Sequence, residues 1–129
     1  MDDKTRAHIL GESIAKLYFE LEGYFVYTNS SGKAEFDLIL SKEGKCFTVE
    51  VKTVSSLKSG TLGDYFEVQL KSVRSNKTEN TIHNFDNTNI DFLAVVNTLD
   101  NTIFVKEAKL IEAKGSLRVY SNKFVSIFG

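Results

Sequence analysis

The residues best placed for chemistry are three charged side chains within apolar stretches of the first half of the chain. Asp37 interrupts the stretch 36–40, and Glu50 and Lys52 alternate with valines in the stretch 46–52. Burying an unpaired charge in such surroundings is costly, so we expect Asp37 to have a partner. Both stretches are rich in β-branched and aromatic residues and flank a short polar segment with a glycine, which predicts a β-hairpin.

Pairing across this hairpin brings the two acidic residues together. If residues 42–45 form the loop, Asp37 lies opposite Glu50, with Cβ atoms about 5 Å apart. Two carboxylates at that distance repel unless they share a proton or hold a cation between them. Lys52 points to the same face as Glu50 and could meet a substrate oxygen. The alternative is an ordinary solvated strand, on which Glu50 and Lys52 pair at little net gain.

A helix is predicted ahead of the hairpin, over residues 5–23, with Gly23 as its C-terminal stop. Its main apolar stripe consists of Ala7, Leu10, Ile14, Leu17, Tyr18 and Leu21, and a weaker stripe nearly opposite consists of Ile9, Ala15 and Phe19. The two stripes predict a helix packed on two sides. Glu12 accompanies the weaker stripe, so it either looks into a cleft or is an ordinary exposed helix glutamate. His8 lies one turn away, but the pair alone is a weak indication of a metal site.

The later strands are predicted from apolar runs bounded by polar segments. We expect strands at 24–28, 65–70, 90–96, 102–105 and 117–120. The run 90–96 is the most apolar, which is typical of a central strand covered on both faces. Residues 55–63 are predicted to form a loop, and residues 107–113 a short helix that stops at Gly115. The run 117–120 is expected at a sheet edge, and the apolar residues 124–128 to cap the core or to contact a partner subunit.

Composition limits the class of protein. A length of 129 residues, 42% of them hydrophobic and 26% charged, indicates one globular domain. The sequence lacks an apolar stretch long enough to span a membrane and does not begin like a signal peptide, so we expect a cytoplasmic protein. Its lone cysteine, Cys46, excludes an intrachain disulfide and a cysteine metal cage. The net charge of −1 is not typical of nucleic-acid binding, yet residues 52–77 carry five basic side chains against two acidic ones.

These motifs together resemble the PD-(D/E)XK nuclease superfamily, and most closely its branch of archaeal Holliday-junction resolvases and intron-associated homing endonucleases. The resemblance covers residues 7–53 well and the later half loosely. It rests on Gly11-Glu12, Ser30-Ser31-Gly32, Asp37 and Glu50-Val51-Lys52. One position departs from the family pattern, because Phe36 stands where proline usually precedes the aspartate.

The resemblance implies an α/β fold over residues 1–129, with a restriction-endonuclease-like mixed β-sheet flanked by helices. It also implies a Mg²⁺-dependent DNA endonuclease that leaves a 5′-phosphate, with Mn²⁺ as a substitute for Mg²⁺. In the family, the residues matching Glu12, Asp37 and Glu50 hold one or two metal ions, and the residue matching Lys52 positions or activates the attacking water. Three carboxylates and a lysine suit this chemistry, because Mg²⁺ prefers oxygen ligands.

Several expectations about substrate and assembly accompany this site. The residues expected to contact the substrate are Ser30, Ser31, Gln69, Arg74, Lys77 and His83. The expected DNA is a specific duplex site or a branched junction, and cutting both strands calls for a homodimer or a higher homo-oligomer. Two other interpretations stay open: a nuclease fold that binds DNA without cutting it, and a nuclease toxin.

Overall fold

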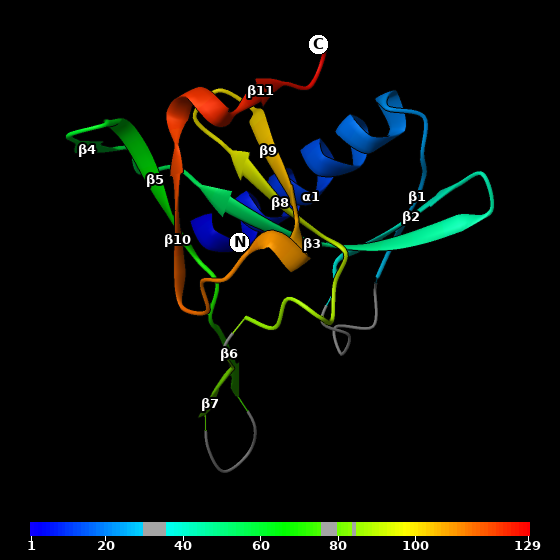
Figure 1. Cartoon of the computed structure of the whole chain (residues 1–129), viewed down its shortest axis with the longest axis horizontal. Coiled ribbons are helices and arrows are strands. Elements are labelled where there is room, and N and C mark those ends of the chain that lie inside the picture. The colour runs from blue at the N-terminus through cyan, green and yellow to red at the C-terminus, as the bar shows by residue number, and fades with distance from the viewer. Residues whose placement is uncertain (30–35, 76–79, 84) are drawn as a thin grey trace.

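The computed structural model describes residues 1–29, 36–75, 80–83 and 85–129. One α-helix, α1 (Asp3–Leu21), precedes the strands β1 (Phe25–Thr28), β2 (Leu38–Lys42), β3 (Lys45–Val54), β4 (Lys58–Gly60), β5 (Gly63–Gln69), β6 (Ser72–Ser75), β7 (Asn80–His83), β8 (Phe92–Asn97), β9 (Thr102–Glu107), β10 (Ser116–Tyr120) and β11 (Val125–Ser126). Two single 3₁₀ turns lie at Ala108–Leu110 and Ser121–Lys123. Figure 1 shows the strands as the bulk of the molecule and α1 behind the large sheet.

The large sheet has six strands in the order β1-β2-β3-β8-β9-β11. Among the described strand pairs, β3 and β8 run parallel and the others antiparallel, so the sheet is mixed as expected. β8 is central and buried over most of its length, which confirms the prediction from its apolar run. A second sheet, β10-β5-β4, and the hairpin β6-β7 complete the strands. β10 lies at a sheet edge, also as expected.

The β2–β3 hairpin has the predicted register. Leu38 pairs with Val49 in the predicted register, but the paired stretch ends there: Asp37 lies just outside β2, and its N–H donates to the carbonyl of Val49. The loop is tighter than predicted, because Lys42 and Lys45 still pair and only Glu43 and Gly44 make the turn. Both turn residues have positive φ angles, 53° and 78°, as a two-residue hairpin turn with the twist of its strands requires.

Alternation along the central strands divides the core into two layers. Val49 and Val51 of β3 and Ala94 of β8 face α1 and pack with helix residues such as Phe19. Leu93 and Val95 face the other way and pack against the second sheet. Glu50 and Lys52 are paired in the parallel register with Leu93 and Val95, so they lie on the face directed toward the second sheet.

The buried face of α1 differs from the predicted one. Gly11, Ile14, Ala15 and Phe19 are buried, which combines members of both predicted stripes and turns a single face to the sheet. Three leucines of the predicted main stripe stay in solvent: Leu10 is 44% exposed, Leu17 40% and Leu21 55%. The prediction of packing on two sides was therefore wrong. A helix buries the face from which small residues allow close approach, and periodicity of large apolar residues does not detect that face.

Three local predictions need correction. The segment 55–63 is not a plain loop, because Lys58–Gly60 forms β4 and turns back onto β5. The expected helix at 107–113 is only the 3₁₀ turn Ala108–Leu110. The second face of the large sheet is covered by β10-β5-β4 rather than by a helix. At the C-terminus, Ile127 is buried in the core as expected, whereas Phe128 is 80% exposed.

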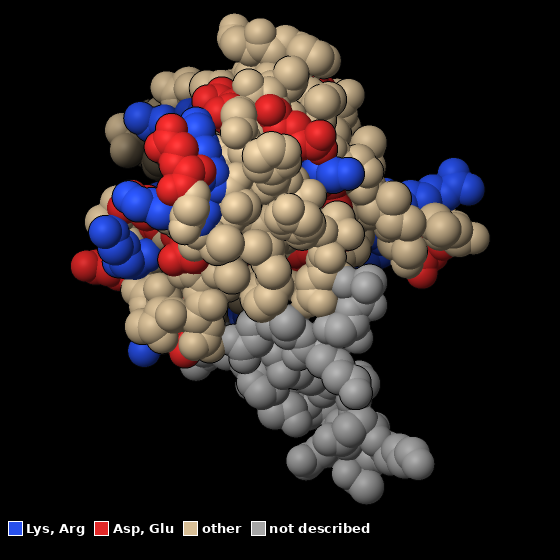
Figure 2. Space-filling model, turned by 90° about the vertical axis from the view of Figure 1, so that its right-hand side faces the viewer, with Lys and Arg blue, Asp and Glu red and all other residues tan. Residues whose placement is uncertain are grey.

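The outer surface is uneven in charge. Figure 2 shows the side that lies at the right of Figure 1, where β1 and the β2–β3 turn are found; uncharged residues form a broad central area there, with charged side chains at its borders. In the edge strand β1, Phe25 is 72% exposed and Tyr27 58%. Within the described ranges, no helix combines the length and apolar character needed to cross a lipid bilayer.

Candidate active site

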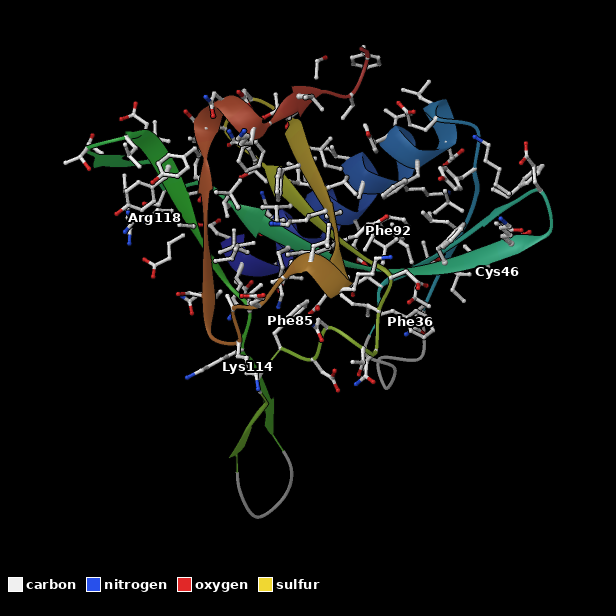
Figure 3. All side chains as sticks on the ribbon, in the orientation of Figure 1. Phe36, Cys46, Phe85, Phe92, Lys114 and Arg118 are labelled. Carbon is white, nitrogen blue, oxygen red and sulfur yellow. The ribbon has the colours of Figure 1, made fainter. Side chains whose placement is uncertain are left out.

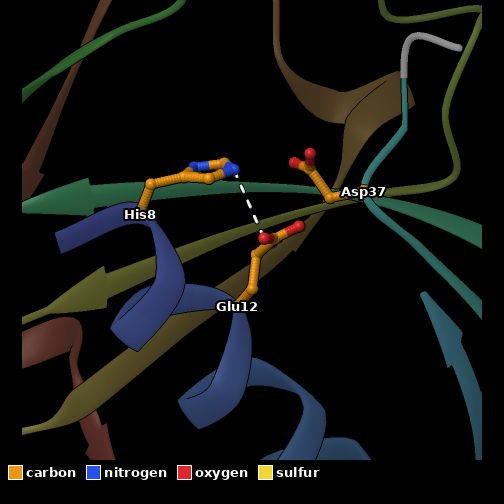
Figure 4. A group of neighbouring side chains, drawn as sticks. All are labelled: His8, Glu12 and Asp37. Atoms are coloured by element: carbon orange, nitrogen blue, oxygen red, sulfur yellow. Dashed lines mark ion pairs between the residues drawn. The ribbon is translucent and has the colours of Figure 1, made fainter. Parts of the chain in front are cut away.

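His8, Glu12 and Asp37 form a group that could hold a metal ion. One ligand atom from each lies within 4.8 Å of the others. His8 and Glu12 are one turn apart on α1, with Nε2 of the histidine 3.3 Å from Oε2 of the glutamate, and Asp37 reaches them from the chain just before β2. Figure 4 shows the three side chains directed toward one another. Two carboxylates supply the oxygen ligands that Mg²⁺ or Mn²⁺ prefers, and the imidazole can orient Glu12 through its contact with that carboxylate.

Asp37 is held by the backbone of β3. Its N–H donates to the carbonyl of Val49 at 2.8 Å, and the N–H of Val51 donates to its Oδ2 at 2.7 Å. Asp37 therefore stands where the ladder between β2 and β3 ends, and its side chain takes the backbone donor that a longer β2 would have used. A half-buried carboxylate held in this way has a fixed orientation, and Asp37 has the partner that the sequence required.

Gly11 sets the distance between α1 and β3. A Cβ atom at this position would collide with Cγ2 of Thr53 and would lie 3.8 Å from Cγ1 of Val51. The glycine thus lets the helix approach the strand closely at the residue next to Glu12. Gly11 and Glu12 have complementary roles. Gly11 leaves room for α1 to approach β3, and Glu12 extends from the helix toward Asp37.

Glu50 and Lys52 form an ion pair next to this group. Nζ of the lysine lies 3.3 Å from Oε1 of the glutamate, and their side chains are 22% and 20% exposed. Both project from the same face of β3, as alternation predicted. Because they are largely shielded from water, this pair is better defined than the exposed ion pairs of the surface.

A cleft of about 760 Å³ is lined by His8 and Asp37 of the first group and by both members of the Glu50–Lys52 pair, whereas Glu12 is not among its lining residues. It is bounded by the first half of α1, by β3 and the segment after it, and by β4 and β5. Its lining includes Lys4, His8, Asp37, Glu50, Lys52, Lys58, Glu67, Gln69 and Lys71. Carboxylates, an imidazole and several ammonium groups therefore meet in one solvent-accessible space.

Comparison with known proteins decides the family. The sequence pattern of the PD-(D/E)XK endonuclease family matches residues 1–123. The chain belongs to the PD-(D/E)XK endonuclease family. Among solved structures, it is similar to the bacterial homing endonuclease I-Ssp6803I, with a TM-score of 0.73, 16% sequence identity, and coverage of 94% of this chain and 80% of that one. No curated protein matches the sequence.

The family match confirms the superfamily inferred from Glu12, Asp37 and the Glu50-Val51-Lys52 motif, and it extends well beyond the motif region. The similarity to I-Ssp6803I shows that the fold is that of an endonuclease. In this PD-(D/E)XK protein, Phe36 replaces the usual proline and packs against the core between the two sheets. The residue before Asp37 is therefore fixed by packing of the Phe36 side chain rather than by the rigid ring of a proline.

Of the sequence-predicted site residues, Glu12 and Asp37 bring carboxylate oxygens within 4.8 Å of one another, and Glu50, Lys52 and Gln69 line the same cleft as Asp37. Ser30, Ser31 and Lys77 lie outside the described residues, as do the side chains of Arg74 and His83, whose backbone belongs to β6 and β7. His8 belongs to the candidate metal-binding group, although the sequence pattern indicated it only weakly. The signal was its spacing of four residues from Glu12, which became informative only once Asp37 was beside them.

Glu12 carries an electrostatic strain that a cation would relieve. Burial raises the pKa of its carboxyl above the model-compound value of 4.5, and the charge of Asp37 raises it further, while His8 acts in the opposite direction. Because the folded pKa exceeds the unfolded one, ionised Glu12 destabilises the metal-free fold at neutral pH. This penalty disappears as the pH falls through the raised folded pKa toward the unfolded value.

We therefore expect Glu12→Gln to be more stable than the natural protein at pH 7 without divalent metal, because the amide carries no charge to bury. The difference should shrink as the pH is lowered below the raised pKa of Glu12. Urea unfolding of both proteins in EDTA at several pH values measures it. An equal difference at every pH would show that Glu12 is not strained by its charge.

Proposed function

We propose that this protein is a divalent-metal-dependent DNA endonuclease that hydrolyses phosphodiester bonds and leaves 5′-phosphate ends. The observation that carries the proposal is that His8 and Asp37, which form a group with Glu12, line one cleft together with the Glu50–Lys52 pair. The PD-(D/E)XK family supports the class of reaction, and the homing endonuclease with a similar fold supports DNA as the substrate.

Each residue is assigned the role that the family resemblance implies. Glu12, Asp37 and Glu50 would hold the metal ion, Mg²⁺ or Mn²⁺. When bound, that ion would lower the pKa of its water and would stabilise the negative charge that develops at phosphorus. Lys52, held 3.3 Å from Glu50, directs its ammonium group at the attacking water or at a phosphate oxygen.

Two further contacts keep the carboxylates oriented. The N–H of Val51 fixes Asp37, and the imidazole of His8 fixes Glu12. Because these contacts do not depend on the substrate, the carboxylates are preorganised before DNA arrives.

The cleft also suits a polyanion despite the net charge of the chain. Lys4, Lys52, Lys58 and Lys71 line it together with three carboxylates. Lysines attract phosphates without regard to base sequence, and a bound divalent ion would offset much of the acidic charge. The DNA therefore approaches along the lysines, and its scissile phosphate lies at the carboxylates.

Cleavage of labelled DNA tests the proposal. Duplex, four-way junction and single-stranded substrates are incubated with Mg²⁺, Mn²⁺ or EDTA, and the product ends are identified by their response to phosphatase and ligase. We expect metal-dependent cutting with 5′-phosphate ends, and the preferred substrate will be cut fastest. Binding of DNA without any product, unaffected by metal, would instead identify a non-catalytic module of the same fold.

A homodimer belongs to the same proposal, because each chain offers one site and a duplex has two strands. Sedimentation equilibrium of the protein with and without duplex DNA measures the assembly. A monomer that nicks one strand at a time would contradict the dimer and leave the chemistry intact.

A further inference from the structure

The outer face of the small sheet β10-β5-β4 has an organised set of side chains. Alternation directs every second residue of these strands away from the core. The β5–β10 face, as we call it, consists of Lys58 on β4, of Tyr65, Glu67 and Gln69 on β5, and of Ser116, Arg118 and Tyr120 on β10. The intervening residues Phe66, Val68 and Val119 are buried beneath it.

Arg118 is held at the centre of this face by an aromatic ring. Its Cζ atom lies 3.9 Å from the centroid of the Tyr65 ring, and Tyr65 in turn meets Tyr120 edge to face at 6.1 Å. Figure 3 shows Arg118 at the left border of the molecule, directed outward. A guanidinium stacked on a ring stays charged and keeps its N–H donors available in a planar fork, which suits the oxygens of a phosphate.

The charges of the β5–β10 face favour an anion. Glu67 is engaged by Lys58, whose Nζ lies 2.8 Å from its Oε2, and this hydrogen bond lowers the pKa of the Glu67 carboxyl. Lys71 extends the positive charge, because its side chain lies over Gly115, where an added Cβ would be 3.1 Å from its Cε atom. Asp64, the other acidic residue of β5, belongs by alternation to the opposite face.

This face continues the cleft of the candidate active site. Lys58, Glu67, Gln69 and Lys71 line the cleft, and Arg118 is paired across the strands with Glu67. A DNA strand with its scissile phosphate at the carboxylates can therefore run on over β5 and β10. Most contacts of proteins with DNA are made to the backbone, and they set its position and register.

We propose that the β5–β10 face binds the sugar–phosphate backbone of the DNA beside the cut, with Arg118 as the principal phosphate contact and Tyr65 as the residue that positions it. The inference rests on the proposed function and adds to it the path of the substrate. The proposed contacts are to phosphates rather than to bases. The guanidinium of Arg118 and the lysine ammonium groups are hydrogen-bond donors that bind any phosphate, whatever the base sequence.

Binding of fluorescent duplex DNA to the 129-residue chain tests the inference, measured by anisotropy in Ca²⁺ over 50 to 200 mM salt. For Arg118→Ala we expect about tenfold weaker binding and a slope of log K against log salt that is smaller by about 0.9, the loss of one phosphate contact. Arg118→Lys keeps the charge without the planar fork and should be intermediate. Tyr65→Ala frees the guanidinium and should weaken binding about threefold.

The matched control is Lys109→Ala, which removes one positive charge from an exposed position near Glu107, outside the cleft and outside the β5–β10 face. It should bind like the natural protein. An Arg118→Ala variant with unchanged affinity and salt slope would overturn the inference and leave the endonuclease intact. A natural protein that neither binds nor cuts DNA would overturn the inference and the proposed function together. Circular dichroism checks the folding of each variant, and Arg118→Gln replaces Arg118→Ala if the alanine variant is unfolded.

Discussion

Replacing Asp37 by asparagine should slow DNA cleavage by about 1000-fold or more, equivalent to about 4 kcal/mol of transition-state stabilisation. The substitution removes a negative charge from the group formed with His8 and Glu12 but keeps the shape of the side chain. The amide oxygen can still accept the hydrogen bond from the N–H of Val51, so the fold should be retained. Steady-state and single-turnover cleavage rates in Mg²⁺ and Mn²⁺ measure the effect.

Asp100→Asn provides the matched control, because Asp100 accepts hydrogen bonds from Thr102 in a turn and does not line the cleft. The same isosteric change there should leave cleavage unchanged. A metal titration followed by thermal unfolding adds a readout that is independent of catalysis: Mg²⁺ should stabilise the natural protein and stabilise Asp37→Asn far less. Full cleavage by Asp37→Asn would show that this group is not the active site, whatever the family.

Replacing Gly11 by alanine should disrupt the site from a residue that contacts no substrate. In an open helix the change would stabilise by about 1 kcal/mol through helix propensity. Here the new methyl group collides with Cγ2 of Thr53, a short β-branched side chain that cannot move aside easily. Overpacking of this kind costs about 1–3 kcal/mol, so we expect a net loss of stability of up to about 2 kcal/mol. Because α1 must shift, Glu12 moves away from Asp37, and a displacement of about 1 Å can slow the reaction about 100-fold.

A second substitution makes this expectation specific. Thr53→Ala removes the methyl group that collides, so the double variant Gly11→Ala, Thr53→Ala should recover both stability and cleavage relative to Gly11→Ala alone. Urea unfolding and cleavage rates for the four proteins form a double-mutant cycle. Additive effects would contradict a direct contact between these two positions, and normal cleavage by Gly11→Ala would show that Glu12 does not depend on the close approach of α1.

Much of the fold and site could be predicted because it is local in sequence. The β2–β3 hairpin brings Asp37 to the backbone of β3 on either side of Glu50, and alternation sends Lys52 to the same side as Glu50, all within 16 residues of chain. Strand β8 was recognisable because its continuous apolar run requires burial on both faces. The local sequence pattern did not predict short strands that lack apolar residues. An example is Lys58–Gly60, which forms a strand only because it pairs with β5.

By itself, the sequence determined the family, and it predicted that the acidic residues and the lysine carry the chemistry. Only the tertiary structure decided which of them meet. The face that α1 buries is set by the fit of Gly11 against Thr53, which brings His8 and Glu12 to Asp37. The stacking of Arg118 on Tyr65 likewise joins two strands that are far apart in the chain. Such contacts depend on the rotation of a helix and the pairing of distant strands, which are chosen by packing of the whole core rather than by any local pattern.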